Sequence, residues 1–171
     1  MSTSNYIAGL EAVHKLRRYT PRGRHPAVRR LYLTEAAVTD LEDPRSAINA
    51  LGLRGFVESA LTRWTSGQSI YADPKGKPRF LKRLDPPPPE IWEIRITEPD
   101  VQVRAFGRFP EPDTLVMTRI CTRGVLGDRG SAEWNETMNG CEQSWKGLGL
   151  PLYGADNIHK YVTENCDDFP I

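Results

Sequence analysis

The sequence of 171 residues has no long apolar run and few cysteines or histidines. No stretch approaches the roughly 18 consecutive apolar residues that suggest a transmembrane helix. Residues 1–6 are not a basic segment followed by an apolar one, so no secretory signal is expected. We therefore expect a cytoplasmic protein that has no membrane partner.

The cysteines and histidines also limit the chemistry that the chain can offer. Cys121, Cys141 and Cys166 are odd in number and widely spaced, which fits reduced thiols better than a disulfide framework. The three histidines share no metal-ligand spacing with them. Residues 122–130 form a glycine-spaced segment but lack the Lys-Ser/Thr ending of a P-loop. The sequence therefore predicts neither a metal site nor a small-molecule cofactor.

Charge is distributed unevenly along the chain, although the net charge is only +1. Residues 1–83 carry 15 Lys and Arg against 7 Asp and Glu, and residues 131–171 carry 2 against 7. Lys15–Arg30 holds seven basic residues and no acid, with prolines and glycine that indicate a loop. Such a segment either contacts phosphates or is a solvated arm.

The length fits one domain with additions at both ends. We expect a basic N-terminal arm over residues 1–27, a domain over residues 28–148 and an acidic C-terminal tail over residues 149–171. A short amphipathic helix within the arm is compatible with its apolar spacing.

Residues 90–123 are the most informative stretch. β-branched and aromatic residues alternate there with polar ones in three runs, which are separated by short clusters of Pro, Asp and Glu. This period predicts half-buried strands, and the short connections favour an antiparallel meander. Its arginines can gather on one face of the sheet.

Helices are predicted on both sides of the meander. After a strand over residues 27–34, Thr34 is a suitable N-cap for a helix over residues 35–42. Asp43 is a suitable cap for a second helix, which Gly67 ends and which Gly52 and Gly55 can divide into two pieces. Ser131 caps a helix with an apolar stripe that Gly149 ends. The predicted fold is α+β: an antiparallel four- to five-stranded sheet with two N-terminal helices packed on it and a C-terminal helix.

Three strand motifs in this order resemble the RelE/ParE toxin superfamily, in particular its HigB-like, phage-derived branch. Ile91–Ile96 is similar to the family's Leu-Trp-Glu-Leu-Arg strand, and Val103–Gly107 to its Tyr-Arg-Val-Phe-Tyr strand. Leu115–Arg119 stands for the third strand, and the resemblance spans residues 28–148 or so. It implies a ribosome-associated, metal-independent mRNA endonuclease of a toxin–antitoxin module, with a small antitoxin protein and the ribosome as partners.

The resemblance also implies which residues act. Toxins of this kind cleave RNA by attack of a 2′-hydroxyl on the adjacent phosphate, where cations stabilise the developing charge. Guanidinium suits this role because its planar fork matches phosphate oxygens. The catalytic candidates are Arg95, Arg104, Arg119 and Arg123. The RNA-binding candidates are Lys75, Lys77, Arg79, Lys82 and Arg129.

Other interpretations are open. The family's Lys-Lys-x-x-x-Lys-x-Pro segment is replaced here by residues 122–129, which offer no His or Tyr for proton transfer. This favours a non-catalytic binding module on the same fold, either a gyrase-binding toxin or a degenerate phage protein. A third hypothesis is nucleic-acid binding through Lys15–Arg30. Arg95 can also pair with Glu93 or Glu98, and Arg104 with Asp100, each pair worth up to about 1 kcal/mol at an exposed site.

Overall fold

The computed structural model describes residues 2–21, 23, 26–72, 80–84, 90–98, 100 and 102–168. Seven strands and the short C-terminal strand β8 form one open, mixed sheet in the order β1-β2-β7-β6-β5-β4-β3-β8. The strands are β1 (Leu16–Arg18), β2 (Arg30–Thr34), β3 (Ile70–Ala72), β4 (Leu81–Arg83), β5 (Trp92–Ile96), β6 (Val103–Glu111), β7 (Thr114–Thr122) and β8 (Cys166–Asp168).

The predicted meander is confirmed. Strands β5, β6 and β7 are consecutive antiparallel neighbours, with Ala105 of β6 opposite Ile94 on one side and Ile120 on the other. Their alternation places one set of apolar residues against helices on one face and leaves charged residues on the opposite face. The α+β class is therefore correct.

The predicted four- to five-stranded antiparallel sheet is wrong. The sheet has more strands, and β2 pairs in parallel with β7, as β3 does with β4 and with β8. No hairpin links β2 to β7, because a long crossover separates them, so nothing local forces the antiparallel direction. Strands β1, β3, β4 and β8 have three residues each, which is too short for a period of two to be recognised.

The helices before the meander were predicted in part. Helix α2 (Glu35–Glu42) begins at Thr34, whose hydroxyl accepts from the amide of Ala37, as expected. The second predicted helix is two helices, α3 (Ala47–Ala50) and α4 (Arg54–Thr65), and Ser46 rather than Asp43 caps the first. Gly52 separates them at φ +68°, a left-handed conformation that glycine adopts easily. The last long helix, α6 (Ala132–Leu148), has the Ser131 cap and Gly149 end predicted for it.

Both segments expected to flank the domain contribute to the sheet. The predicted arm holds α1 (Thr3–Ala12) and β1, which pairs with β2. The predicted tail holds α7 (Ile158–Tyr161) and β8, which pairs with β3. Tyr161 is fully buried in the main core beside Trp92. Apolar residues at wide sequence spacing thus tie both ends to the central strands.

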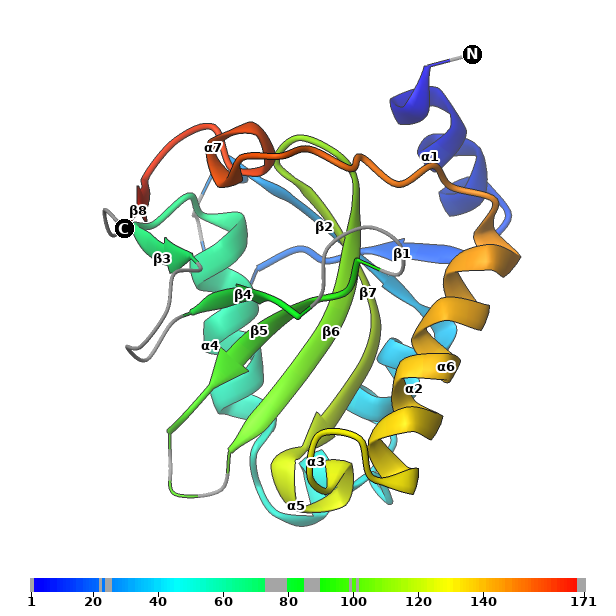
Figure 1. The fold of residues 1–171 in the computed structure, drawn as a ribbon, viewed down its shortest axis with the longest axis vertical. Helices are drawn as coiled ribbons and strands as arrows, with labels where there is room; N and C mark the ends of the chain where they lie inside the picture. The colour runs from blue at the N-terminus through cyan, green and yellow to red at the C-terminus, as the bar shows by residue number, and fades with distance from the viewer. Residues whose placement is uncertain are drawn as a thin grey trace.

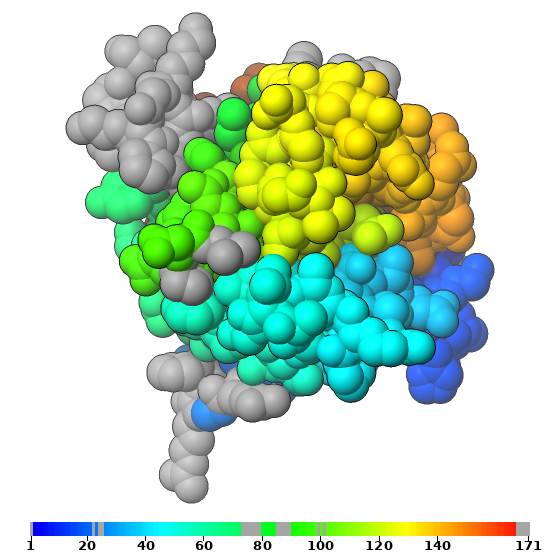
Figure 2. All heavy atoms as spheres, turned by 90° about the horizontal axis from the view of Figure 1, so that it is seen from below, coloured from blue at the N-terminus to red at the C-terminus, as the bar shows by residue number. Residues whose placement is uncertain are grey.

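Helices cover both faces of the sheet (Figure 1). Helices α2, α3 and α4 pack on one face around the larger apolar core. Helices α1, α5 (Arg123–Leu126) and α6 pack on the other around two smaller clusters. Seen from below, the start of α6 and the α2–α4 layer lie on opposite sides of the strand ends (Figure 2). No helix of the described ranges is both long and apolar enough to cross a bilayer.

Candidate functional site: a basic pocket on the sheet

Five cationic side chains converge on a pocket of about 180 Å³ where strands β4 to β6 meet α5. We call it the basic pocket. Among the described residues, one carboxylate lines it, that of Glu93. The cationic residues are Lys82, Arg95, Arg104, Arg123 and Arg129, and the apolar ones are Leu84, Leu126 and Trp134. The excess of positive charge suits an anionic ligand.

Strand register brings the charged residues of the sheet together. Lys82 of β4 lies opposite Glu93 of β5, and Arg95 lies opposite Arg104 of β6. Residues two apart on a strand share a face, so Glu93 and Arg95 point to the same side. The pairing of three strands therefore places four charged side chains side by side.

Arg104 and Glu93 form the buried base of the pocket. Their side chains are exposed by only 5% and 6%, and Nε of Arg104 lies 3.6 Å from Oε2 of Glu93. Arg104 also donates to the carbonyl of Val103 at 3.0 Å and to Oε1 of Gln102 at 2.8 Å. Nε of Arg95 lies 3.5 Å from the other oxygen of Glu93 and has no hydrogen-bond partner within the described ranges.

Burial is unfavourable for both charges of this pair. Desolvation raises the pKa of Glu93 above its ordinary value, although the nearby arginines and Lys82 act in the opposite direction. Desolvation also lowers the pKa of Arg104, against the attraction of Glu93. Charged groups that are held at an energetic cost next to a cavity are typical of functional sites.

The segment after β7 supplies the other wall. Thr122 caps α5, and Arg123 at its start donates to the carbonyl of Gly127 and lies 3.7 Å from Asp128, whose carboxylate is fully exposed. Arg129 donates to the carbonyl of Leu84 at 3.3 Å. The bond to Leu84 places Arg129 at the end of β4, and both guanidinium groups line the pocket.

Arg119, the fourth catalytic candidate, does not line the basic pocket. Its Nε lies 2.9 Å from Oδ2 of Asp40 on α2, and the same oxygen accepts from the amide of Ile120 at 2.8 Å. Through this ion pair Arg119 joins α2 to the sheet. On β6 the residue opposite Arg119 is Phe106, after which the register of the two strands shifts. The RNA-binding candidates Lys75, Lys77 and Arg79 lie outside the described residues.

Sequence reasoning brought together Arg95, Arg104, Arg123, Lys82 and Arg129 but missed the role of Glu93. It considered Glu93 only as a surface partner of Arg95. The signal was present, since Trp-Glu-x-Arg on a strand puts Glu and Arg on one face. Glu93 places a carboxylate in the pocket, whereas residues 122–129 offer no His or Tyr. The expected partner of Arg104 was Asp100, whereas the structure pairs it with Glu93.

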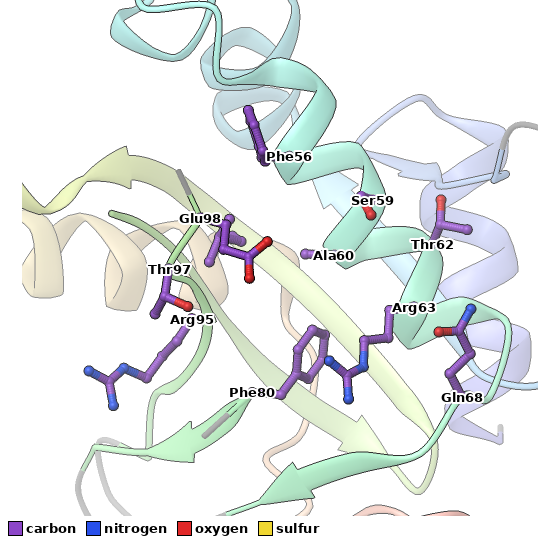
Figure 3. A pocket seen from close by; sticks show the side chains of 11 residues that line it. Phe56, Ser59, Ala60, Thr62, Arg63, Gln68, Phe80, Arg95, Thr97 and Glu98 are labelled. Carbon is purple, nitrogen blue, oxygen red and sulfur yellow. The ribbon is translucent and has the colours of Figure 1, made fainter. Parts of the chain in front are cut away.

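A second pocket, of about 370 Å³, shares Arg95 with the basic pocket. It lies between α4 and the end of β5 (Figure 3). The guanidinium of Arg63 lies across the Phe80 ring, 5.1 Å from its centroid, and Phe56 is 41% exposed. In Figure 3 the side chain of Arg95 points away from α4. We call this the aromatic pocket.

Comparison with known proteins gives no match to a family model, a curated protein or a solved structure. Within the described ranges, no group of three His, Cys, Asp or Glu residues could hold a metal ion.

Proposed function

We propose that this protein binds RNA in the basic pocket and acts as a RelE/ParE-like toxin that cleaves mRNA at the ribosome. The observation that carries this is the convergence of five cationic side chains from separate segments around one buried carboxylate. A phosphodiester would accept hydrogen bonds from the guanidinium groups, whose forked geometry matches phosphate oxygens.

The residues of the pocket can be given roles in such a reaction. Glu93 would take the proton of the 2′-hydroxyl as its oxygen bonds to phosphorus. The same proton would then pass to the 5′-oxygen as the phosphorus–oxygen bond breaks, which leaves a cyclic phosphate and a free 5′-hydroxyl. The raised pKa of Glu93 suits this exchange because it brings proton affinity closer to neutral pH. Arg104 and Arg95 would stabilise the charge on the phosphate.

The aromatic pocket shares Arg95 with the basic pocket and would hold another base of the bound RNA. Base stacking on an aromatic ring contributes about 1–3 kcal/mol and tolerates any sequence. The ring of Phe56, which is 41% exposed, provides such a surface.

A non-catalytic binding module on the same fold is the second candidate function. It is favoured by the position of Glu93, since each of its oxygens faces a guanidinium group at 3.5–3.6 Å. A carboxylate held in this way can balance charge without transferring a proton. Such a module would bind RNA or a protein target such as gyrase. In either case, a small acidic antitoxin segment is the partner that would cover the basic pocket.

The first test measures binding of a fluorescein-labelled single-stranded RNA by anisotropy. Arg104→Gln and Arg123→Gln should each weaken binding about tenfold and reduce its dependence on salt, because each removes a phosphate contact. Arg45→Gln is the matched control. It removes the same charge from a side chain that is 89% exposed and paired with Asp43. If all three variants weaken binding equally, the basic pocket is not the RNA-binding site.

The second test separates the enzyme from the binding module. Induction of the protein in a bacterial host should arrest growth and create new RNA 5′ ends at defined codon positions. Glu93→Gln should abolish these ends and strengthen RNA binding, because it removes the negative charge of the pocket. If Glu93→Gln still cleaves, Glu93 is not the base. If the native chain creates no new ends but arrests growth, the binding module is supported.

A further inference from the structure

A third pocket, which shares no lining residue with the basic or the aromatic pocket, holds two buried donors that have no acceptor among the described residues. It has a volume of about 540 Å³ and lies between β6 and the C-terminal half of α6. Its lining includes Arg108, Trp145 and two leucines that follow the helix, Leu150 and Leu152. We call it the helix pocket.

Arg108 is the unusual residue of this cavity. Its side chain projects from β6 toward α6, and the residue is only 4% exposed. Its Nε has no hydrogen-bond partner in the described part of the chain. Its guanidinium carbon lies 5.8 Å from the centroid of the Trp145 ring. A buried guanidinium normally has a carboxylate or several carbonyl partners, because its desolvation is expensive.

Trp145 adds a second donor of the same kind. It is 3% exposed, and its Nε1 lacks a partner among the described residues. Buried donors are almost always satisfied, so two beside one cavity indicate a missing acceptor. At the rim, Glu142 lies 3.9 Å from Lys146 and also attracts Arg108, which opposes the lowering of the Arg108 pKa by desolvation. The cavity therefore offers one net positive charge and a neutral donor.

The remaining walls are apolar and fixed. Leu150 is 6% exposed and belongs to an apolar cluster with Trp145. Gly149 ends α6 at φ +68°, and the amide of Tyr153 donates to the carbonyl of Phe109 at 2.9 Å. This turn and hydrogen bond hold the segment along β6. The volume is within the range of pockets that bind small molecules.

We propose that the helix pocket binds a small molecule with one carboxylate on an apolar body. The carboxylate would accept from Arg108 and from Nε1 of Trp145, and the apolar body would lie on Leu150 and Leu152. A single negative charge matches the single excess cation better than a phosphate dianion would. The site is independent of the basic pocket and of the function proposed for it.

The test uses the full chain labelled with ¹⁵N and follows the indole N–H signals of its four tryptophans. Hexanoate should shift the Trp145 signal in a saturable manner, and Trp145→Phe identifies that signal. Hexanamide has the same apolar chain without the charge and should bind about tenfold more weakly or worse, since hydrogen bonds to charged groups are the stronger ones. The Trp134 signal reports on the basic pocket and should not move.

Arg108→Gln should reduce hexanoate affinity about tenfold or more, whereas the exposed control Arg45→Gln should leave it unchanged. If Arg108→Gln does not fold, the comparison of hexanoate with hexanamide on the native chain decides. The proposal is overturned if the Trp145 signal does not saturate, if both ligands bind equally, or if hexanoate moves only the Trp134 signal. It is also overturned if folded Arg108→Gln binds hexanoate as the native chain does.

Discussion

Glu93 and Arg104 face each other diagonally across strands β5 and β6, with Oε2 of the carboxylate 3.6 Å from Nε of the guanidinium. Both side chains are buried, and burial raises the pKa of Glu93 and lowers that of Arg104, which favours the neutral form of each. The attraction between them is therefore smaller than the cost of their desolvation. A pair of this kind is poor evidence for stability, which supports the binding role proposed for it.

Replacing both partners with methionine tests this assignment. We expect Glu93→Met/Arg104→Met to unfold in urea with an unchanged free energy, or one higher by up to about 4 kcal/mol, because apolar replacement of a buried ion pair is often neutral or stabilising. RNA binding should weaken at the same time. A double variant that is less stable by more than about 2 kcal/mol would show that the pair supports the fold.

The pKa of Glu93 also predicts a dependence on pH. Its folded pKa lies above its ordinary value of 4.5, so the folded state retains a proton that the unfolded chain has lost. The resulting stability is fully present below pH 4.5 and is lost as the pH rises through the folded pKa. The native chain should therefore lose stability relative to Glu93→Gln between pH 4 and neutral pH. Urea midpoints of both proteins across this range measure the difference, and a constant difference would contradict the shift.

The long, regular elements were readable from the sequence. The alternation in β5 and β6 spans enough residues to define their faces, and Thr34 and Ser131 provide direct hydrogen-bonding signals for the helices that they cap. The same alternation placed Arg95 and Arg104 on one face, whereas Lys82, Arg123 and Arg129 were candidates only through the family resemblance. Patterns of this kind involve residues that are close together in the sequence, so they can be recognised without the structure.

Contacts between distant segments were not readable. The parallel pairing of β2 with β7 is decided by packing of the intervening helices and not by any turn. Arg119 looked equivalent to Arg104 because both are arginines on central strands, yet Asp40 of α2 binds it. Arg29 belonged to a basic stretch in sequence, whereas in the fold it is buried. Each error concerns a partner that is distant in the sequence, and local patterns do not show such contacts.

Asp40 and Arg119 should differ in their importance for stability. Asp40→Ala removes both the acceptor for the Ile120 amide and the partner of Arg119, and should lower the free energy of unfolding by about 1–3 kcal/mol. Arg119→Ala removes only a side chain that is 41% exposed, which should cost about 1 kcal/mol or less. Chemical denaturation measures both. Arg119→Ala should bind RNA as tightly as the native chain does. A loss of affinity as large as that of Arg104→Gln would show that Arg119 also belongs to the RNA-binding site.

Two glycines provide a matched pair for packing. A Cβ at Gly107 on β6 would lie 2.4 Å from the carbonyl oxygen of Val116 on the neighbouring strand, so Gly107→Ala should destabilise the fold by about 1–3 kcal/mol. A Cβ at Gly147 on α6 would meet nothing within 4 Å, and alanine there should stabilise by about 0.5–1 kcal/mol. Thermal unfolding of both variants should therefore shift in opposite directions. A shift in the same direction would mean that β6 and β7 can separate to admit a methyl group.

Arg29 is expected to fasten the C-terminal segment to the sheet. It is 1% exposed, stacks on Trp64 and donates to the carbonyls of Glu164 and Asn165 at 2.6 and 3.3 Å. Arg29→Lys keeps the charge but loses the forked donor geometry, so it should lower the free energy of unfolding by about 2 kcal/mol or more.

Hydrogen exchange can locate this effect. The amide of Ile70 on β3 donates to the carbonyl of Asn165, so it should exchange faster in Arg29→Lys than in the native chain. The amide of Ala105 lies in the central meander and provides the internal reference, since only global unfolding should expose it. Equal acceleration at both amides would mean that Arg29 supports the whole core. Faster exchange at Ile70 alone would mean that it specifically holds β8 against β3, because a guanidinium can bind two successive carbonyls of that segment at once and an ammonium group cannot reproduce that geometry.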